Sequence, residues 1–440
     1  MSQGPVPADD ERLLIRGGRP LRGQLTISGS KNAALPEMVA ALLTPQPLRL
    51  RNVPEIEDVD TMTECLHALG VRVERSGSGC TLEAAELRSV APPAGPARRM
   101  RASFLLLGAL LARAGEARVP LPGGDDIGLR RVEQHIEGLR AMGAVISETD
   151  AGEVVAHASR LHGAHIRLDM PTVTGTENLM MAAVTAEGIT VLSNAAREPH
   201  VVDLALCLRG MGARIDGAGS DRIVIEGVEA LHGSDHAVRA DYLEAGTFAF
   251  AAAATGGDVE LDGLVSEDLG HVLQKLRLAG CVIEEGEAHL RVSRPGPLLA
   301  VDMTTWPHPG FATDLQAPYV ALMTQATGTA IVSEFLFENR FRHVGELVRL
   351  GARVSVDGRS AIICGPSRLA GAWLTVPDIR SGAALVIAGL CAEGTTECSG
   401  LHHLDRGYQD LGGKLRQLGA DLERRGGSKA LGHPSPSPTS

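Results

Sequence analysis

The stretch LHALGVRVE, residues 66–74, joins the end of an amphipathic helix to a short alternating strand through Gly70, and the same pattern occurs six times. The six segments are LHALGVRVE (66–74), LRAMGAVIS (139–147), LRGMGARID (208–216), LRLAGCVIE (276–284), LVRLGARVS (347–355) and LRQLGADLE (415–423). Their glycines, Gly70, Gly143, Gly212, Gly280, Gly351 and Gly419, lie 73, 69, 68, 71 and 68 residues apart. A glycine directly after a helix usually takes the left-handed conformation that ends it. The spacing therefore predicts six α/β repeats of about 70 residues.

A second kind of helix occurs in these repeats, and it is apolar on nearly all sides. Examples are KNAALPEMVAALL (31–43), SFLLLGALLARAG (103–115), TENLMMAAVTAEG (176–188) and LQAPYVALMTQATG (315–328). Helices of this composition lie in protein interiors. Three βαβαββ units that close around their buried helices would make one domain, so the sequence predicts an α/β protein with two domains of three repeats each.

The length and composition fit this architecture and exclude several classes of protein. A chain of 440 residues, 44% of them apolar, exceeds one ordinary hydrophobic core. The net charge of −11 and the presence of only 12 aromatic residues argue against a nucleic-acid-binding surface. The N-terminus lacks the pattern of a signal peptide, and no apolar run approaches the roughly 20 residues of a membrane span. We therefore expect a cytoplasmic protein.

Cysteine and histidine spacing predicts neither a disulfide framework nor a metal site. The seven cysteines are odd in number and scattered, which indicates free thiols in a reducing compartment. His402 and His403 are adjacent, and neighbouring side chains on a strand would point to opposite faces. We expect these two histidines to have a structural role and no metal to be bound.

Charged residues gather where the apolar helices begin. Lys31 and Asn32 follow the small residues of SGSKNAA, and Arg101 stands just before the apolar helix of residues 103–115. Small residues allow a ligand to approach the backbone, and the free N–H groups of a helix start favour an anion. Exposed positions of no function would also suit these residues.

The loop LPGGDDIGLRR, residues 121–131, has two adjacent carboxylates, Asp125 and Asp126, followed by two adjacent arginines. A mobile lid with an acid–base group and an anion anchor has this composition, and so does a surface turn. Asp314, in FATDLQ, suits either a binding site or a helix cap. Acid–base pairs, catalytic or structural, also occur in FENR (337–340), DIR (378–380) and DRGY (405–408). These features predict a cleft for a polyanionic small molecule but do not specify a reaction.

At these motifs the chain resembles the enolpyruvyl transferases, most closely the UDP-N-acetylglucosamine 1-carboxyvinyltransferases. The resemblance runs from about Leu13 to Arg424, and it is carried by TISGSKNAALP, NVPEIEDVDT, MRAS, LPGGDDIGLR, SNAAREPHVVD, DRIVIEGVE, FATDLQA, FENRFRHV and HHLDRGY. It implies two inside-out α/β barrels. Residues 30–238, with a lid loop at 121–131, would form one domain, and residues 1–29 with 239–440 the other. Residues 1–11 and the tail after about residue 426 are expected to be disordered.

The resemblance also implies an activity. The protein would transfer the enolpyruvyl group of phosphoenolpyruvate to the 3-hydroxyl of UDP-N-acetylglucosamine, through a tetrahedral ketal that loses phosphate, as in peptidoglycan synthesis. It would need neither a metal nor an organic cofactor. The sequence leaves the oligomeric state open, with a monomer favoured. The residues implied in phosphoenolpyruvate binding are Lys31, Arg101, Arg130 and Arg406. Those implied at the acceptor or elsewhere in the cleft are Asn32, Thr172, Val173, Thr313, Asp378 and Arg380, with Asp314 as the base at the acceptor hydroxyl.

Asp125 stands at the lid position that usually carries a reactive cysteine. To protonate C3 of phosphoenolpyruvate it must be neutral, and raising its pKa by about 3 units would cost roughly 4 kcal/mol. Asp126 would raise the pKa, whereas Arg130 would lower it. We expect fosfomycin, an epoxide that alkylates the thiol, to inactivate this protein poorly.

Other departures concern the acceptor. Arg131 replaces a usual proline, Tyr242 stands where an arginine is common, and Glu55 and Glu57 occupy positions that often hold lysines. Paralogues that enolpyruvylate UMP in nucleoside-antibiotic pathways resemble the chain equally well at this level. A shikimate-pathway acceptor is disfavoured by the SGSKNAALP and DRGY blocks. An inactive nucleotide-binding homologue remains a second alternative.

Overall fold

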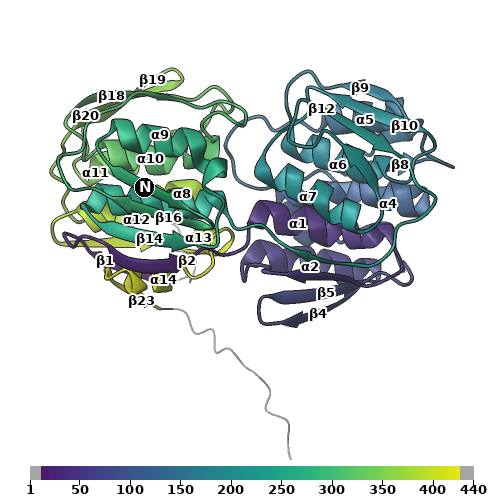
Figure 1. Cartoon of the computed structure of the whole chain (residues 1–440), viewed down its shortest axis with the longest axis horizontal. Coiled ribbons are helices and arrows are strands. Elements are labelled where there is room, and N and C mark those ends of the chain that lie inside the picture. Colours follow the sequence, from purple (N-terminus) through teal and green to yellow (C-terminus); the bar gives the residue numbers. More distant parts are fainter. Residues whose placement is uncertain (1–10, 427–440) are drawn as a thin grey trace, which may run out of the picture.

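The computed structural model describes residues 11–426, and these form two lobes with separate hydrophobic cores (Figure 1). One buried cluster extends over residues 33–238, and the other combines residues 13–27 with residues 242–422. The terminal segments for which we expected disorder lie almost entirely outside the described residues. No helix in the described part of the chain has the length and apolarity needed to cross a membrane.

The first lobe has three small sheets around three inner helices. The sheets are β13-β3-β5-β4, β6-β8-β7 and β11-β12-β10-β9. Their strands are β3 (Leu48–Arg51), β4 (Arg72–Ser76), β5 (Gly79–Glu83), β6 (Glu116–Pro120), β7 (Val145–Glu148), β8 (Glu153–His157), β9 (His165–Arg167), β10 (Ile189–Ser193), β11 (Arg214–Asp216), β12 (Arg222–Glu226) and β13 (Ser234–Ala237). The helices are α1 (Lys31–Ala40), η1 (Ala41–Leu43), α2 (Glu57–Leu69), α3 (Ala94–Arg99), η2 (Arg101–Leu105), α4 (Leu106–Ala114), α5 (Glu133–Ala141), α6 (Val173–Ala183) and α7 (Pro199–Gly210).

The second lobe repeats this plan. Its sheets are β15-β16-β14-β2, β17-β18-β20-β19 and β21-β22-β1-β23. The strands are β1 (Arg12–Arg16), β2 (Arg22–Thr26), β14 (Asp258–Asp262), β15 (Val282–Gly286), β16 (His289–Ser293), β17 (Met303–Thr304), β18 (Gly328–Ser333), β19 (Val354–Asp357), β20 (Ser360–Gly365), β21 (Trp373–Thr375), β22 (Thr395–Ser399) and β23 (Asp421–Arg425). The helices are α8 (Tyr242–Thr255), η3 (Ser266–Leu269), α9 (Gly270–Leu278), η4 (Thr313–Leu315), α10 (Gln316–Met323), α11 (Val344–Arg349), α12 (Ile379–Cys391), α13 (His402–Asp405) and α14 (Leu411–Gln417).

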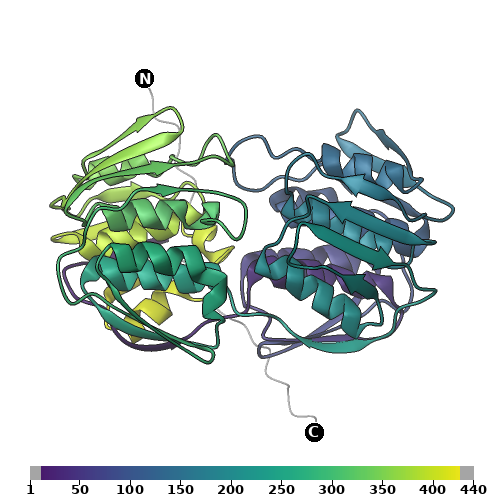
Figure 2. The ribbon, with the colours of Figure 1, turned by 45° about the horizontal axis from the view of Figure 1, so that its top comes forward.

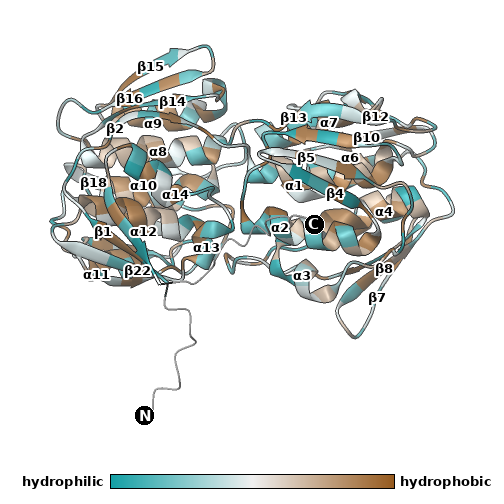
Figure 3. Cartoon of the chain, turned by 90° about the horizontal axis from the view of Figure 1, so that it is seen from below, coloured by the Kyte–Doolittle hydropathy of each residue, from teal (hydrophilic) through white to brown (hydrophobic). Residues whose placement is uncertain are grey.

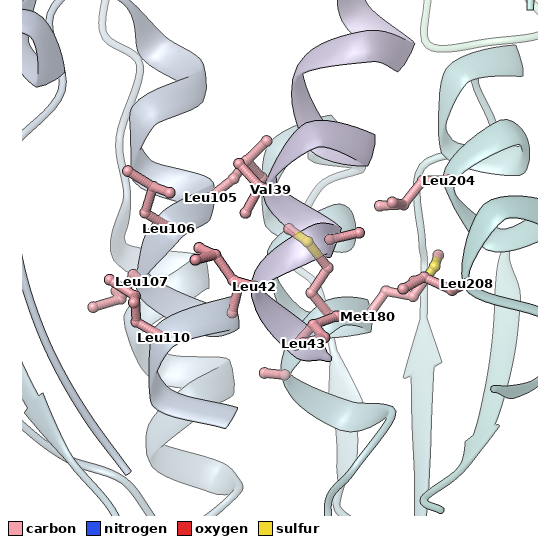
Figure 4. Packing of buried hydrophobic residues seen from close by; sticks show 14 of the residues in the cluster. Val39, Leu42, Leu43, Leu105, Leu106, Leu107, Leu110, Met180, Leu204 and Leu208 are labelled. Carbon is pink, nitrogen blue, oxygen red and sulfur yellow. The ribbon is translucent and has the colours of Figure 1, made fainter. Parts of the chain in front are cut away.

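The inner helices are α1, α4 and α6 in one lobe and α8, α10 and α12 in the other, and their side chains are almost all buried. In Figures 1 and 2 the sheets lie on the outside of each lobe and these helices lie inside. Figure 3 shows hydrophobic residues concentrated on the helices between the sheets. Figure 4 shows Val39 of α1 and Leu42 of η1 on the side that faces Leu105 of η2 and Leu106 of α4, so side chains between neighbouring helices fill this core.

The six repeats are confirmed at their glycines. All six adopt a positive φ, between 90° and 103°, directly after a helix of the outer layer or its last turn. A side chain with a Cβ rarely takes this conformation, which explains why glycine recurs at this position. The two-lobed α/β fold with three repeats in each lobe is confirmed as well.

The chain crosses between the lobes twice, at one place. Residues 27–30 lead from β2 into α1, and residues 238–241 lead from β13 into α8. The two segments are antiparallel, since Ser30 N donates to Arg239 O and Asp241 N donates to Ser28 O, both at 2.8 Å. Gly29 must be a glycine, because a Cβ there would lie 1.7 Å from the backbone oxygen of Asn52. This crossing places the first turn of α1, with Lys31, at the junction of the lobes.

Candidate active site

A cavity of about 870 Å³ lies between the lobes, and the first residues of all six inner helices line it. These residues are Lys31 of α1, Arg101 of η2 before α4, Val173 of α6, Tyr242 of α8, Thr313 of η4 before α10, and Ile379 of α12. A helix N-terminus carries roughly half a positive charge and free N–H groups. Six such ends around one cavity make it a site for an anion.

A second cavity, of about 950 Å³, lies in the first lobe near the opposite ends of α1 and α4, among residues such as Leu43, Arg113 and Arg160. It contains none of the candidate site residues. We therefore take the cavity between the lobes as the candidate active site.

Two arginines in this cavity have no carboxylate partner within ion-pair distance in residues 11–426. Arg101 donates from Nη2 to the backbone oxygen of Arg131 at 2.9 Å, and Arg130 lies over the ring of Phe337, 5.9 Å from its centroid. Burial, and then the charge of Arg130, lower the pKa of Arg101 to about 10. Burial, and next the charge of Arg340, lower the pKa of Arg130. Two desolvated like charges favour the binding of an anion beside them.

The other cations on this side of the cavity are held by carboxylates. Arg406 donates from Nε to Asp58 at 2.9 Å and from Nη1 to Asp125 at 2.7 Å. Lys31 Nζ lies 3.2 Å from the second oxygen of Asp58. Arg406 belongs to the second lobe, whereas Asp58 on α2 and Asp125 in the loop of residues 121–131 belong to the first. This network therefore joins the lobes across the floor of the cavity.

Asp125 is ionised in this arrangement. Burial raises its pKa, but the charges of Arg406 and then Lys31 outweigh burial, and the pKa lies below its ordinary value. The sequence suggested Arg130 and Asp126 as the groups that set this pKa. Arg130 does interact with Asp125, but Arg406 and Lys31 are the charges with the largest effect on its pKa. The carboxylate of Asp126 instead faces the second lobe, 3.4 Å from Asn339 Nδ2 and 3.7 Å from Arg342 Nη1.

Asp314 occupies the opposite wall. Its carboxylate binds Arg340 through one oxygen and Arg380 Nε through the other, the latter at 3.1 Å. Burial raises the pKa of Asp314, but the guanidinium groups of Arg380 and Arg340 outweigh it and hold the pKa well below its ordinary value. Asp314 is therefore a carboxylate at any physiological pH, and it can accept a hydrogen bond from a substrate hydroxyl.

The loop of residues 121–131 spans the cavity and binds the second lobe. Leu129 N donates to Glu338 Oε2 at 3.1 Å, Asn339 N donates to Ile127 O at 3.0 Å, and Asn339 Nδ2 donates to Asp126 O at 3.1 Å. Gly128 has φ +128° and lies against Glu338. The loop thus closes one side of the cavity.

Most of the residues expected at the site line this cavity. They are Lys31, Asn32, Arg101, Asp125, Arg130, Thr172, Val173, Thr313, Asp314 and Arg380. Arg406 reaches it through Asp125. Asp378 does not line it: its carboxylate caps α12, accepting from Arg380 N at 3.1 Å and Ser381 N at 2.9 Å. Thr172 caps α6 in addition to lining the cavity, through a bond from Gly175 N at 3.3 Å.

Sequence reasoning missed two groups and misplaced a third. Asp58 lies within EDVD in the first turn of α2, where an acidic residue usually stabilises the helix by interacting with its dipole. The only sequence feature that pointed to Arg340 was the acid–base pair in FENR (337–340). In the structure its ion-pair partner is Asp314 rather than Glu338. His402 and His403 lie on the short helix α13, not on a strand, and their ring centroids are 4.1 Å apart.

Among the described residues, one group has the spacing of metal ligands, and it lies outside the cavity. His236 Nε2 is 3.1 Å from Asp203 Oδ1 and 3.5 Å from Glu37 Oε1. Burial lowers the pKa of His236, but its hydrogen bonds to Asp203 and Glu37 outweigh burial and raise the pKa to about 10. The protonated ring is itself the cation beside the Asp203 carboxylate, whose pKa lies below its ordinary value, whereas burial raises the pKa of Glu37 to about 8.

Comparison with known proteins agrees with this geometry. Residues 15–415 match the family model described as EPSP synthase (3-phosphoshikimate 1-carboxyvinyltransferase). The structure of the enolpyruvyl transferase NikO from Streptomyces tendae is similar, with 28% identity, a TM-score of 0.85, and coverage of 94% of this chain and 98% of that chain. An EPSP synthase from Acinetobacter baumannii has the same fold, with 19% identity, a TM-score of 0.74, and coverage of 94% and 100%. The chain is an enolpyruvyl transferase and belongs to the EPSP synthase family.

Proposed function

We propose that the protein transfers the enolpyruvyl group of phosphoenolpyruvate to a hydroxyl of a uridine nucleotide, with UDP-N-acetylglucosamine as the first candidate acceptor. The observation that supports this best is the cavity in which Lys31, Arg101 and Arg130 stand at helix starts or in the lid, opposite the carboxylate of Asp314. Phosphoenolpyruvate carries close to three negative charges. Preorganised cations in a closed site bind such a group and stabilise charge that develops during reaction.

The reaction places one proton donor and one proton acceptor on opposite sides of phosphoenolpyruvate. The acceptor hydroxyl adds its oxygen to C2 and gives up its proton toward Asp314, while C3 receives a proton from Asp125. The product of this step is a tetrahedral ketal that still carries phosphate. Loss of a C3 proton and cleavage of the C2–O bond to phosphate then release inorganic phosphate and the enolpyruvyl ether. Each step needs a group that accepts and returns a proton.

Asp125 becomes able to act as the acid only when phosphoenolpyruvate is present. Before binding, Arg406 and Lys31 keep it ionised. The phosphate and carboxylate of phosphoenolpyruvate compete for the same two cations, and their negative charge raises the pKa of a neighbouring carboxyl. Substrate binding thus favours the protonated form that delivers a proton to C3.

UMP is the second candidate acceptor, because several cavity residues differ from those expected for a sugar nucleotide. Tyr242 is buried and neutral, with its ring stacked 6.4 Å from that of His200. The Arg131 side chain is largely exposed, and its carboxylate neighbour is Glu133 at 3.9 Å. UMP lacks the N-acetylglucosamine and the second phosphate of the sugar nucleotide, so it carries less negative charge, and Tyr242 supplies no cation where an arginine is common.

The test is phosphate release from phosphoenolpyruvate with UDP-N-acetylglucosamine and UMP as parallel acceptors and shikimate 3-phosphate as control. Turnover with the sugar nucleotide would support a role in peptidoglycan synthesis in the cytoplasm. Turnover with UMP alone would support a nucleoside-antibiotic pathway. If the folded protein released no phosphate with any of the three, the proposal would fail and the inactive nucleotide-binding homologue would be favoured. Arg130→Ala, which removes a cation with no carboxylate partner within ion-pair distance among residues 11–426, should raise the KM for phosphoenolpyruvate.

A further inference from the structure

Two large aromatic side chains stand exposed on the second-lobe wall of the cavity. Trp306 is 58% exposed and Phe335 is 56% exposed, and their ring centroids lie 5.8 Å apart at an interplanar angle of 60°. Both line the cavity between the lobes. Neither ring takes part in the hydrophobic core, and neither is needed for the chemistry at Asp314. Their exposure beside the active site indicates a ligand that covers them.

Hydrogen bonds and close packing hold the backbone of the two aromatic residues in place. Trp306 and Phe335 follow the paired strands β17 and β18, and Phe335 N donates to Thr305 Oγ1 at 3.0 Å. Trp306 N donates to Phe311 O at 3.0 Å. Gly310 packs closely on Trp306, because a Cβ there would lie 2.5 Å from the Trp306 Cβ. A platform with a rigid backbone loses little conformational freedom when a flat ring stacks on it.

Polar groups and a lid residue surround this platform. Arg359 donates from Nη1 to Phe335 O at 2.8 Å and lies 3.2 Å from Glu338 Oε1. The other oxygen of Glu338 accepts from Leu129 N, and the Leu129 side chain, 72% exposed, also lines the cavity. A flat ring between Leu129 and the aromatic pair would have donors at Arg359 and an acceptor at Glu338 along its edge.

We propose that Trp306 and Phe335 bind the pyrimidine ring of the acceptor, with Arg359 and Glu338 at its polar edge. Uracil has two carbonyl oxygens on either side of one N–H, which matches a guanidinium donor next to a carboxylate acceptor. Stacking of a base on an aromatic side chain typically strengthens binding by roughly 5- to 100-fold. This assignment rests on the proposed function, since it takes the acceptor to be a uridine nucleotide.

The chain has only two tryptophans, so Trp306 can report its own contact. Trp373 lies on β21 outside the cavity, beneath the guanidinium group of Arg12, at 4.1 Å from the ring centroid. In the Trp373→Phe variant all tryptophan fluorescence comes from Trp306. We expect UMP and UDP-N-acetylglucosamine to quench it saturably, and ribose 5-phosphate, which lacks the base, to leave it unchanged.

Steady-state kinetics supply the second readout. Trp306→Ala should raise the KM for the uridine nucleotide by roughly 5- to 100-fold, with kcat and the KM for phosphoenolpyruvate within about twofold of the wild type. Trp306→Phe should recover most of the loss, and Trp373→Ala serves as the matched control with no change.

The two proposals fail in different ways. If nucleotides are turned over but Trp306→Ala leaves their KM unchanged, or if ribose 5-phosphate quenches as strongly as UMP, the aromatic platform is wrong and the function stands. If UMP quenches Trp306 but no uridine nucleotide is turned over, the platform stands and the proposed activity is wrong. Saturable quenching by added protein and not by nucleotides would assign the aromatic pair to a protein partner and overturn the inference.

Discussion

Replacing Asp125 by asparagine should change phosphoenolpyruvate binding and turnover in opposite directions. In the structure Asp125 forms an ion pair with Arg406. The distance from Asp125 Oδ1 to Arg406 Nη1 is 2.7 Å, and about 15% of each side chain is exposed. Asparagine keeps the shape but removes the charge that competes with phosphoenolpyruvate for this guanidinium. It also removes the only proton that the side chain could give to C3.

The magnitude follows from the environment of this ion pair. Two unit charges about 4 Å apart attract by about 4 kcal/mol at an effective dielectric constant of about 20, and a hydrogen bond to a charged group contributes about 1.5–3 kcal/mol net. We use the hydrogen-bond range of about 1.5–3 kcal/mol for the step in which phosphoenolpyruvate replaces Asp125 as the partner of Arg406. Without the competing carboxylate, phosphoenolpyruvate should bind roughly 10- to 100-fold more tightly. Loss of the general acid should lower kcat by about 10²- to 10⁴-fold.

Calorimetric titration with phosphoenolpyruvate and an assay of phosphate release measure the two effects separately. Asp126→Asn is the matched control, because Asp126 is the adjacent carboxylate and contacts Asn339 and Arg342 rather than Arg406. The control should leave both quantities within about twofold of the wild type. Weaker phosphoenolpyruvate binding in Asp125→Asn, or a kcat equal to that of the control, would refute the reasoning.

Four further predictions concern the lid, the thiol site and the fold. Fosfomycin should leave the wild type active and should inactivate Asp125→Cys, because Arg406 and Lys31 favour the reactive thiolate of the new cysteine. Mass spectrometry should show the adduct on the cysteine of the variant. An adduct on Asp125 of the wild type would contradict this prediction. Gly128→Ala should lower kcat at least about tenfold with little change in Tm, because its Cβ would lie 2.2 Å from Glu338 Oε2 and prevent the loop from binding the second lobe. Phe250→Ala should lower the free energy of unfolding by about 3–5 kcal/mol, measured by urea titration, since this fully buried ring packs on Phe311 and Tyr319. Burial lowers the pKa of His343 to about 4, so an unfolded chain, with a histidine pKa near 6.5, binds the proton first. The contribution of His343 to the free energy of unfolding should therefore fall by up to about 3 kcal/mol between pH 6.5 and 4. His343→Phe should reduce the slope by this amount and leave the part due to His135 and His200, whose pKa values burial also lowers.

The repeats could be predicted from the sequence because their signals are local. A glycine with positive φ after a helix depends on the residues of one turn, and the six glycines all adopt this conformation. Helices apolar on all sides can be satisfied only inside the lobes, so their buried position also follows from composition. The residues at the starts of these helices were found for the same reason, since every inner helix has its N-terminus at the cavity.

The partners of the charged residues could not be predicted in the same way. Arg130 is the nearest arginine to Asp125 in the sequence, yet the actual partner, Arg406, is 281 residues away. Trp306 and Phe335 meet only because β17 and β18 are parallel neighbours. Pairs of this kind depend on how strands are ordered and how the lobes meet, and hydrophobic periodicity contains no information about either. Asp378 is a case in which the sequence suggested a contact with the cleft and the structure shows a local role. Its carboxylate caps helix α12.

The net charge of −11 gives no indication of the anion that this protein is proposed to bind. Its cavity combines six helix N-termini with two arginines that lack carboxylate partners among residues 11–426. Four further cations, Lys31, Arg340, Arg380 and Arg406, are held by Asp58, Asp125 and Asp314. Such carboxylates keep the lysine and arginine side chains in place at low electrostatic cost until a stronger anion replaces them. In the proposed reaction, an incoming phosphoenolpyruvate would find its cations already oriented, and the carboxylate that it would displace from Arg406 is Asp125, the proposed acid. Binding and acid catalysis would in this way be linked through a single guanidinium group.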